Sequence, residues 1–216
     1  MSLVVYHLND SRSHRVIWLL EELSLEYEIF RYEKTRARFA PAALEAAHPL
    51  GKTPILEFDG QRIIESGAIV DLLIRRRGAG RLAPPGDSPE YDAYQQWLHY
   101  AEASAMACLT HLNWLRLLRV TDGPGRRRLE AETARHLAFV DAALTHRDWL
   151  LGQEFTGADV QLSYFGEVCA FAGRLGPYPA LQDWVRRFQA RPAYAAAIRA
   201  GGPYKYAAAA AAKAAP

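Results

Sequence analysis

The segment spanning residues 48–69 contains residue types that could bind an anion. Two short apolar runs flank Asp59-Gly60, a dipeptide that favours a tight hairpin turn because both of its residues tolerate positive φ. After the second run, apolar residues recur at helical spacing beyond Ser66, so this serine is expected to begin a helix. The N–H groups at a helix start carry a partial positive charge, which suits a bound carboxylate.

Pro54 stands at the mouth of the first apolar run. A proline has no N–H to donate to a strand ladder, so Pro54 indicates either an edge position or a cis peptide bond. Together with the predicted helix start at Ser66, it suggests a small anion site beside an exposed strand edge.

This combination resembles the glutathione-binding half of the glutathione transferases. The matching motifs are Gly51-Lys52-Thr53-Pro54 and Glu65-Ser66-Gly67-Ala68-Ile69. Their order and spacing, near residue 50 of a chain of this length, make the resemblance specific. It implies that the bond before Pro54 is cis and that Ser66 holds the γ-glutamyl carboxylate of glutathione.

The resemblance also assigns the other polar groups of glutathione to residues of this chain. Lys52 would meet the glycyl carboxylate, because a flexible cation can follow a terminal charge, although a solvated loop lysine is common. The backbone of Thr53, next to Pro54, would pair with the cysteinyl unit as an added strand. Glu65 would face the ammonium group or remain merely exposed, and Ser66 would bind the carboxylate, cap its helix, or do both.

The thiol of glutathione needs a hydrogen-bond donor, because the thiolate is the nucleophile. Lowering a thiol pKa from ~8.5 by about two requires ~3 kcal/mol. One hydrogen bond to a charged acceptor, worth ~1.5–3 kcal/mol, together with a helix-start dipole can supply this. Glutathione transferases place a serine, tyrosine or cysteine for this purpose at the first strand-to-helix turn, which here spans residues 9–15.

Within this turn, Ser11 is the first candidate for the activating residue, because Arg15-Val16 resembles the pair that opens this helix in serine-type members. Asn9 is the alternative donor, since some bacterial members use an amide. Ser13 is expected to be the N-cap of the helix, and it ranks third as a candidate for activating the thiol. Tyr6 lies too early in the strand and is expected in the core. The turn contains no cysteine, which argues against the classes that reduce mixed disulfides.

The composition is that of an ordinary globular protein. Half of the 216 residues are hydrophobic and the formal net charge is +2, so no basic excess suggests a nucleic-acid partner. No apolar run approaches 18 residues and no leader opens the chain, which argues against a membrane anchor. Cys108 and Cys169 are expected as buried fillers, and His7, His14 and His48 fit no metal motif. We therefore expect no metal and a cytoplasmic location with reduced thiols.

The elements that must position these residues follow the order βαβ, then α, then ββα. Strands are predicted at residues 3–8, 27–32, 53–58 and 61–64, and helices at 16–23, 40–47 and from 66 onward. This order implies a four-stranded mixed sheet, the thioredoxin-like arrangement, in a domain of residues 1–77.

The second half reads as an all-helical domain, residues 90–206, after a proline- and glycine-rich linker at 78–89. One helix is predicted from 89 to about 120 and another to about 146. Thr156 and Asp159 resemble a capping box, and loss of the Asp159 cap should cost about 0.5–2 kcal/mol. The glutathione transferases carry the same capped helix, so the resemblance covers about residues 3–200. The alanine-rich tail, 207–216, is either a C-terminal extension or an artificial addition and receives no function.

The resemblance implies a homodimeric detoxification enzyme that adds the glutathione thiolate to small hydrophobic electrophiles, with glutathione as co-substrate and no other cofactor. The electrophile pocket would lie between the two domains, with candidate linings at Trp114, Leu117, Leu118, Tyr164 and Tyr204. One alternative is a glutathione-dependent peroxidase, disulfide reductase or isomerase on the same fold. Another is a non-catalytic binding or regulatory module, because a fold does not determine a function.

Overall fold

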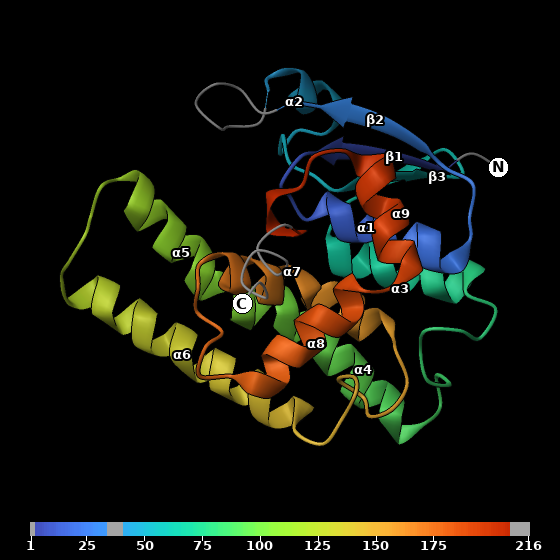
Figure 1. Ribbon diagram of the computed structural model, residues 1–216. Coiled ribbons are helices and arrows are strands. Elements are labelled where there is room, and N and C mark those ends of the chain that lie inside the picture. The colour runs from blue at the N-terminus through green and yellow to red at the C-terminus, as the bar shows by residue number, and fades with distance from the viewer. Residues whose placement is uncertain (1–2, 34–40, 208–216) are drawn as a thin grey trace. The chain divides into compact units, whose positions relative to one another are not determined.

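The computed structural model describes residues 3–33 and 41–207. The chain forms two compact units (Figure 1). Residues before Ala83, together with those from Arg187 on, form the first unit, and Ala83–Arg186 form the second. The first break falls inside the predicted linker at 78–89.

The sheet of the first unit has four strands: β1 (Leu3–Leu8), β2 (Glu28–Tyr32), β3 (Ile55–Phe58) and β4 (Gln61–Ile63). Their order is β2-β1-β3-β4, with β1 and β2 parallel and the other pairs antiparallel, so the predicted mixed sheet is confirmed. Because β3 is an inner strand, the prediction that Pro54 lies at an exposed strand edge is wrong. The alternative is confirmed, since the Thr53-Pro54 bond is cis and the ladder of β3 begins only after it.

Three helices cover this sheet: α1 (Ser13–Leu23), α2 (Ala43–Ala47) and α3 (Ser66–Arg77). Helix α2 lies on one face, and α1 and α3 lie on the other (Figure 1). Ala40, where the second helix was predicted to begin, is outside the described residues. Tyr6 and Leu8 pack with Leu44 of α2, as expected for Tyr6. Side chains alternate along a strand, so His7 points to the opposite face, toward α1.

The predicted hairpin turn between β3 and β4 is confirmed. Asp59 and Gly60 have φ of 49° and 80°, the two positive values that a type I′ turn requires. This turn sets the register of the hairpin, and β4 then leads directly into α3 at Ser66.

A helix from the far end of the chain, α9 (Pro192–Gly201), packs along α1 (Figure 1). The indole of Trp18 meets the ring of Tyr194 edge-on, with centroids 5.4 Å apart. The guanidinium of Arg191 donates to both carboxylate oxygens of Glu22, at 2.6 and 2.9 Å. The structure thus divides the chain differently from the predicted domain of residues 90–206, because this helix completes the first unit.

The second unit contains α4 (Pro89–Tyr100), a π-helical segment η1 (Ala101–Ala105), α5 (Met106–Leu117), α6 (Pro124–Leu144) and α7 (Gly157–Phe171), and α8 (Pro179–Gln189) begins within it. The single helix predicted from residue 89 to about 120 is therefore a run to Leu117 that widens into a π-helical turn at its middle. Apart from the isolated bridge between Trp149 and Gly152, the described part of this unit has no β-pairing.

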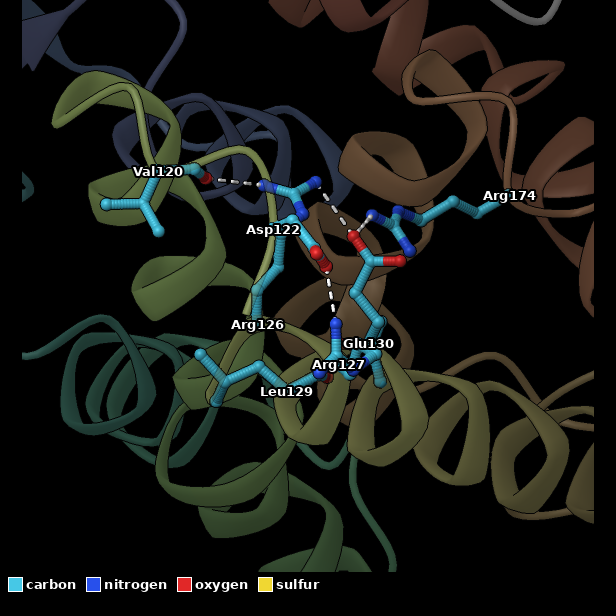
Figure 2. Close-up of polar contacts among 8 residues, drawn as sticks. Val120, Asp122, Arg126, Arg127, Leu129, Glu130 and Arg174 are labelled. Carbon is cyan, nitrogen blue, oxygen red and sulfur yellow. Dashed lines mark hydrogen bonds and ion pairs between the residues drawn. The ribbon is translucent and has the colours of Figure 1, made fainter. Parts of the chain in front are cut away.

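Ion pairs and hydrogen bonds connect residues of the turn between α5 and α6 to the start of α6 and to Arg174 (Figure 2). The Arg126 guanidinium donates to the carbonyl of Val120 and to the Glu130 carboxylate, at 3.3 and 2.8 Å. Arg127 donates to Asp122 at 2.6 Å, and Arg174 lies 3.7 Å from Glu130. These charges neutralise one another at the surface, so we read the cluster as local bracing that contributes little stability.

Asp159 joins three segments of the second unit. Its fully buried carboxylate accepts hydrogen bonds from the N–H groups of Leu150 and Thr156 and from the indole of Trp184, all at 2.9–3.0 Å. The predicted capping box with Thr156 is present. Burial raises the pKa of Asp159 to about 6, although these donors act in the opposite direction. Asp159 is therefore a folding residue whose role extends well beyond its own helix.

Replacing Asp159 should cost more than loss of a simple cap. We expect Asp159→Ala to lower the free energy of unfolding by about 3 kcal/mol or more, because it leaves buried donors on three segments without their acceptor. Urea unfolding of the wild type and the variant measures this. Asp122→Ala, at an exposed ion pair, serves as the matched control and should leave the midpoint nearly unchanged. A loss for Asp159→Ala as small as that of the control would contradict the bracing role.

Candidate functional site

The start of α3 has the geometry expected of an anion site. Glu65 precedes the helix with φ of 65°, a left-handed conformation that costs a non-glycine residue about 1–3 kcal/mol and that is common at binding sites. Its side chain is exposed, whereas Ser66 behind it is buried. The carbonyl of Glu65 accepts from the N–H of Ile69, which closes the first helical turn. The N–H groups of that turn then point out of the helix end.

The segment before β3 places the next candidates. Gly51, with φ of 55°, donates its N–H to the carbonyl of His48 at 2.8 Å and turns the chain toward the sheet. Lys52 is exposed, Thr53 is half-buried and Pro54 is buried behind its cis bond. The backbone of Thr53 lies beyond the ladder of β3, where an extended peptide could pair with it.

A hydrogen bond joins this segment to the turn between β1 and α1. The hydroxyl oxygens of Ser11 and Thr53 lie 3.0 Å apart, although the residues are 42 positions apart in sequence. The structure thus brings the first-choice activating residue to the residue expected to pair with the cysteinyl unit. Asn9 lies in the same turn, and its Oδ1 is buried without a well-aligned hydrogen-bond partner among the described residues.

Ser13 does not act as the predicted helix cap. Helix α1 begins at Ser13 itself, with Arg12 at the N-cap position and no capping hydrogen bond from a side chain. The Ser13 hydroxyl instead lies 2.8 Å from Nδ1 of His7 and 2.8 Å from the hydroxyl of Ser11. Ser11 Oγ accepts from the backbone N–H of Ser13 at 3.3 Å and so performs part of the capping role.

Two buried histidines lie beneath the turn. Burial lowers the pKa of His14 to about 3, with a smaller contribution from His7. Burial and the neighbouring Arg31 lower the pKa of His7 to about 4, and the backbone of Gly201 and the side chain of Asn9 only partly offset this. Both rings are therefore neutral at pH 7, so the site contains no buried cation from either of them.

Helix α9 and the segment after it contact the turn between β1 and α1. The ring of Tyr204 stacks on His14 at 4.1 Å, and Tyr194 meets the same imidazole edge-on at 5.3 Å. The carboxylate of Asp10 accepts from the backbone N–H of Lys205 at 2.9 Å and lies 3.4 Å from its ammonium group. The sequence carries no local signal for these contacts, because the two segments are about 190 residues apart.

The candidate lining residues of the electrophile pocket differ in exposure. Trp114, Leu117 and Leu118 are exposed near the end of α5. Tyr164 and Tyr204 are buried, and Tyr204 is occupied by its stack on His14.

Comparison with known proteins decides the family. The family model described as the N-terminal domain of glutathione S-transferase matches residues 1–74, and the one described as the C-terminal domain matches residues 123–187. Glutathione S-transferase 3 of Schizosaccharomyces pombe is 33% identical over 206 residues, which cover 88% of this chain and 84% of that protein. The chain belongs to the glutathione S-transferase family.

Two further comparisons bear on this glutathione S-transferase. A crystal structure of a glutathione S-transferase from Actinobacillus pleuropneumoniae superposes with a TM-score of 0.84 at 29% identity and covers 91% of each chain. The disulfide-bond oxidoreductase YfcG of Escherichia coli is 25% identical and covers 90% of this chain and 93% of its own. The transferase assignment and the thioredoxin-like fold therefore hold, and the family also includes a relative that acts on disulfides.

The remaining expectations concern metals, membranes and cysteines. In the described part of the chain, no group of three or more potential ligands could hold a metal ion. Within these same residues, no helix has both the length and the apolar character needed to cross a membrane. Cys108 and Cys169 are buried free thiols, as expected, and burial raises the pKa of both.

The buried His14 should make the stability of this transferase fall in acid. Its pKa in the folded state lies below the ordinary value of 6.5, so the unfolded chain takes up the proton first as the pH falls. Stability is then lost from about pH 6.5 down to about pH 3, by ~1.4 kcal/mol per pH unit. Between pH 7.5 and 5.0 we expect His14→Phe to lose about 2 kcal/mol less than the wild type.

Urea unfolding at the two pH values measures this difference. Substitution of the exposed His111 by phenylalanine is the control and should leave the pH dependence of the wild type intact. Equal pH dependence in the wild type and His14→Phe would show that His14 is not held neutral by the fold.

Proposed function

We propose that this protein uses Ser11 to stabilise the thiolate of bound glutathione and adds that thiolate to small hydrophobic electrophiles. The observation that carries the proposal is the 3.0 Å contact between the hydroxyls of Ser11 and Thr53. A cysteinyl unit paired with the backbone of Thr53 would bring its sulfur to the Ser11 hydroxyl. Among the described residues, neither Asn9 nor Ser13 forms a hydrogen bond with the segment before Pro54.

The rest of glutathione would follow the line from the cis bond to α3. Ser66 and the N–H groups that follow it would hold the γ-glutamyl carboxylate, and Glu65, exposed beside them, would meet the ammonium group. Lys52 would meet the glycyl carboxylate at the other end. Each charged group of the tripeptide then has a partner of opposite charge or a set of donors.

The two buried histidines do not stabilise the thiolate by charge. Since His7 and His14 are neutral at pH 7, neither attracts the thiolate as a cation. One charge-assisted hydrogen bond from Ser11 contributes about 1.5–3 kcal/mol, enough to lower the thiol pKa by about one to two.

A second candidate function is reduction of glutathione mixed disulfides, supported by the similarity to the disulfide-bond oxidoreductase YfcG. The absence of a cysteine from residues 9–15 favours the transferase. In either case we expect a homodimer in the cytoplasm, where the two free cysteines would stay reduced.

The activating residue can be identified by comparing two variants. We expect Ser11→Ala to raise the pKa of the bound thiol by about one to two while glutathione affinity changes little, because only the bond to sulfur is lost. Ultraviolet absorption of the thiolate, titrated against pH in the complex, measures this. Asn9→Ala is the matched control, since it lies in the same turn and should leave that pKa unchanged.

The reversed pattern, with an effect of Asn9→Ala alone, would move the role to Asn9. Turnover of a chlorodinitrobenzene-type electrophile, in parallel with a glutathione mixed disulfide, separates the two candidate functions. Binding without turnover across electrophiles, peroxides and disulfides would leave only a binding module.

A further inference from the structure

We propose that Ser13 and His7 are positioning residues, which turn the proton of the Ser11 hydroxyl toward the sulfur of bound glutathione. The inference rests on the proposed role of Ser11 and extends it to two residues that would not touch the substrate. Neither residue is exposed, and both belong to the same unit as the site.

Four polar groups form a continuous chain from the sheet to the site. His7 Nδ1 lies 2.8 Å from Ser13 Oγ, Ser13 Oγ lies 2.8 Å from Ser11 Oγ, and Ser11 Oγ lies 3.0 Å from Thr53 Oγ1. His7 is in β1 and Ser13 opens α1, so both ends of the turn that carries Ser11 supply a member. The His7–Ser13 and Ser13–Ser11 contacts both have the length of ordinary hydrogen bonds, so each must contain one proton.

Counting protons shows what the chain can do. Ser13 Oγ accepts from the backbone N–H of Leu8 at 3.2 Å, which leaves it one lone pair and its own proton. If His7 Nδ1–H donates to Ser13, Ser13 donates to Ser11. Ser11 then accepts from both the hydroxyl and the backbone N–H of Ser13. Its own proton has no inward acceptor left and turns to Thr53 or to an incoming sulfur.

The opposite direction would serve the thiolate poorly. If Ser13 donated to His7, the contact between Ser13 and Ser11 would have to use the Ser11 proton. The sulfur would then face a hydroxyl whose proton points away from it. The Leu8 carbonyl, 3.3 Å from Ser13 Oγ, also competes for the Ser13 proton. An anionic sulfur is the strongest acceptor at either end of the chain, so its binding selects the outward direction.

His7 can supply the proton that this direction needs. Its neutral ring has a single proton to place on either nitrogen. On Nε2, which lies against Gly201, the proton is donated to the backbone of that glycine, so this acceptor competes with Ser13 for it. With thiolate bound, the proton belongs on Nδ1. The position of this proton is therefore an observable consequence of the relay, defined here as His7, Ser13 and Ser11.

The first test uses variants that leave Ser11 in place. Ser13→Ala and His7→Leu should each raise the pKa of the bound thiol by about one and lower kcat about tenfold, with the KM for glutathione within about twofold. His7→Asn, which can place an N–H near the position of Nδ1, should restore values close to the wild type. Ser163→Ala removes another buried hydroxyl and is the control, with a stability loss but an unchanged thiol pKa.

The second test needs no variant at the buried positions. Nitrogen-15 NMR of histidine-labelled wild-type protein, saturated with reduced glutathione, should show the His7 proton on Nδ1. The same labelled protein with Ser11→Ala should not show this response to glutathione. A merely structural His7 would keep one tautomer in both proteins.

The outcomes separate the relay from the proposed function. If Ser11→Ala leaves the thiol pKa unchanged, the role proposed for Ser11 fails and the relay fails with it. If Ser11→Ala raises that pKa but Ser13→Ala and His7→Leu do not, the relay is overturned and Ser11 stands. If either buried variant does not fold, a His7 proton that stays on Nε2 in the wild-type complex overturns the relay alone.

Discussion

The contact between Ser11 and Thr53 is the constraint on which the site depends. It joins the turn after β1 to the segment before β3, and the antiparallel pairing of these strands makes it possible. The register opposes Tyr6 to Ile55, so the residues that follow β1 lie beside the residues that precede β3. A slip of one residue would turn His7 to the wrong face and would separate it from Ser13. The buried apolar residues that fix the register therefore also fix the site.

Several neutral groups support this contact, and the buried Arg15 lies in the first turn of α1. Serine hydroxyls, two imidazoles held neutral by burial and the ring of Tyr204 surround the turn, and the ion pair of Asp10 with Lys205 lies at its outer side. A protonated imidazole at His7 or His14 would attract a thiolate more strongly, but it would carry a large desolvation penalty in the empty site. Oriented hydroxyls avoid that penalty and still offer a donor at one point. The consequence is a loss of stability in acid, where the unfolded chain binds protons that the buried histidines do not.

Local signals in the sequence predicted much of the fold. The hairpin at Asp59-Gly60, the helix start at Ser66 and the capping box at Thr156 each depend on residues a few positions apart, and the structure contains all three. The prediction failed where distant segments decide the outcome. Helix α9 completes the first unit through contacts with α1 that no local pattern encodes, and the π-helical turn at Ala101–Ala105 interrupts a run whose spacing reads as an ordinary helix.

The candidate site shows the same division. The motifs around Pro54 and Ser66 supplied the residues expected to bind glutathione, and the resemblance supplied the cis bond. The assignment of Ser13 as a cap followed its position, but α1 begins at Ser13 itself, and its hydroxyl turns to His7. Which serine meets Thr53 depends on the path of the turn in space, and spacing along the chain does not report that path.

The most direct measurement is calorimetric titration of the intact, folded protein with reduced glutathione, for the wild type and for Ser66→Ala. The account predicts saturable heat for the wild type at or below millimolar glutathione. For the variant it predicts affinity lower by about tenfold or more, because one hydrogen bond to a carboxylate is lost. No detectable heat for the folded wild type at millimolar glutathione would contradict the claim that the tripeptide binds between the cis bond and α3. Equal affinities would contradict the role of Ser66.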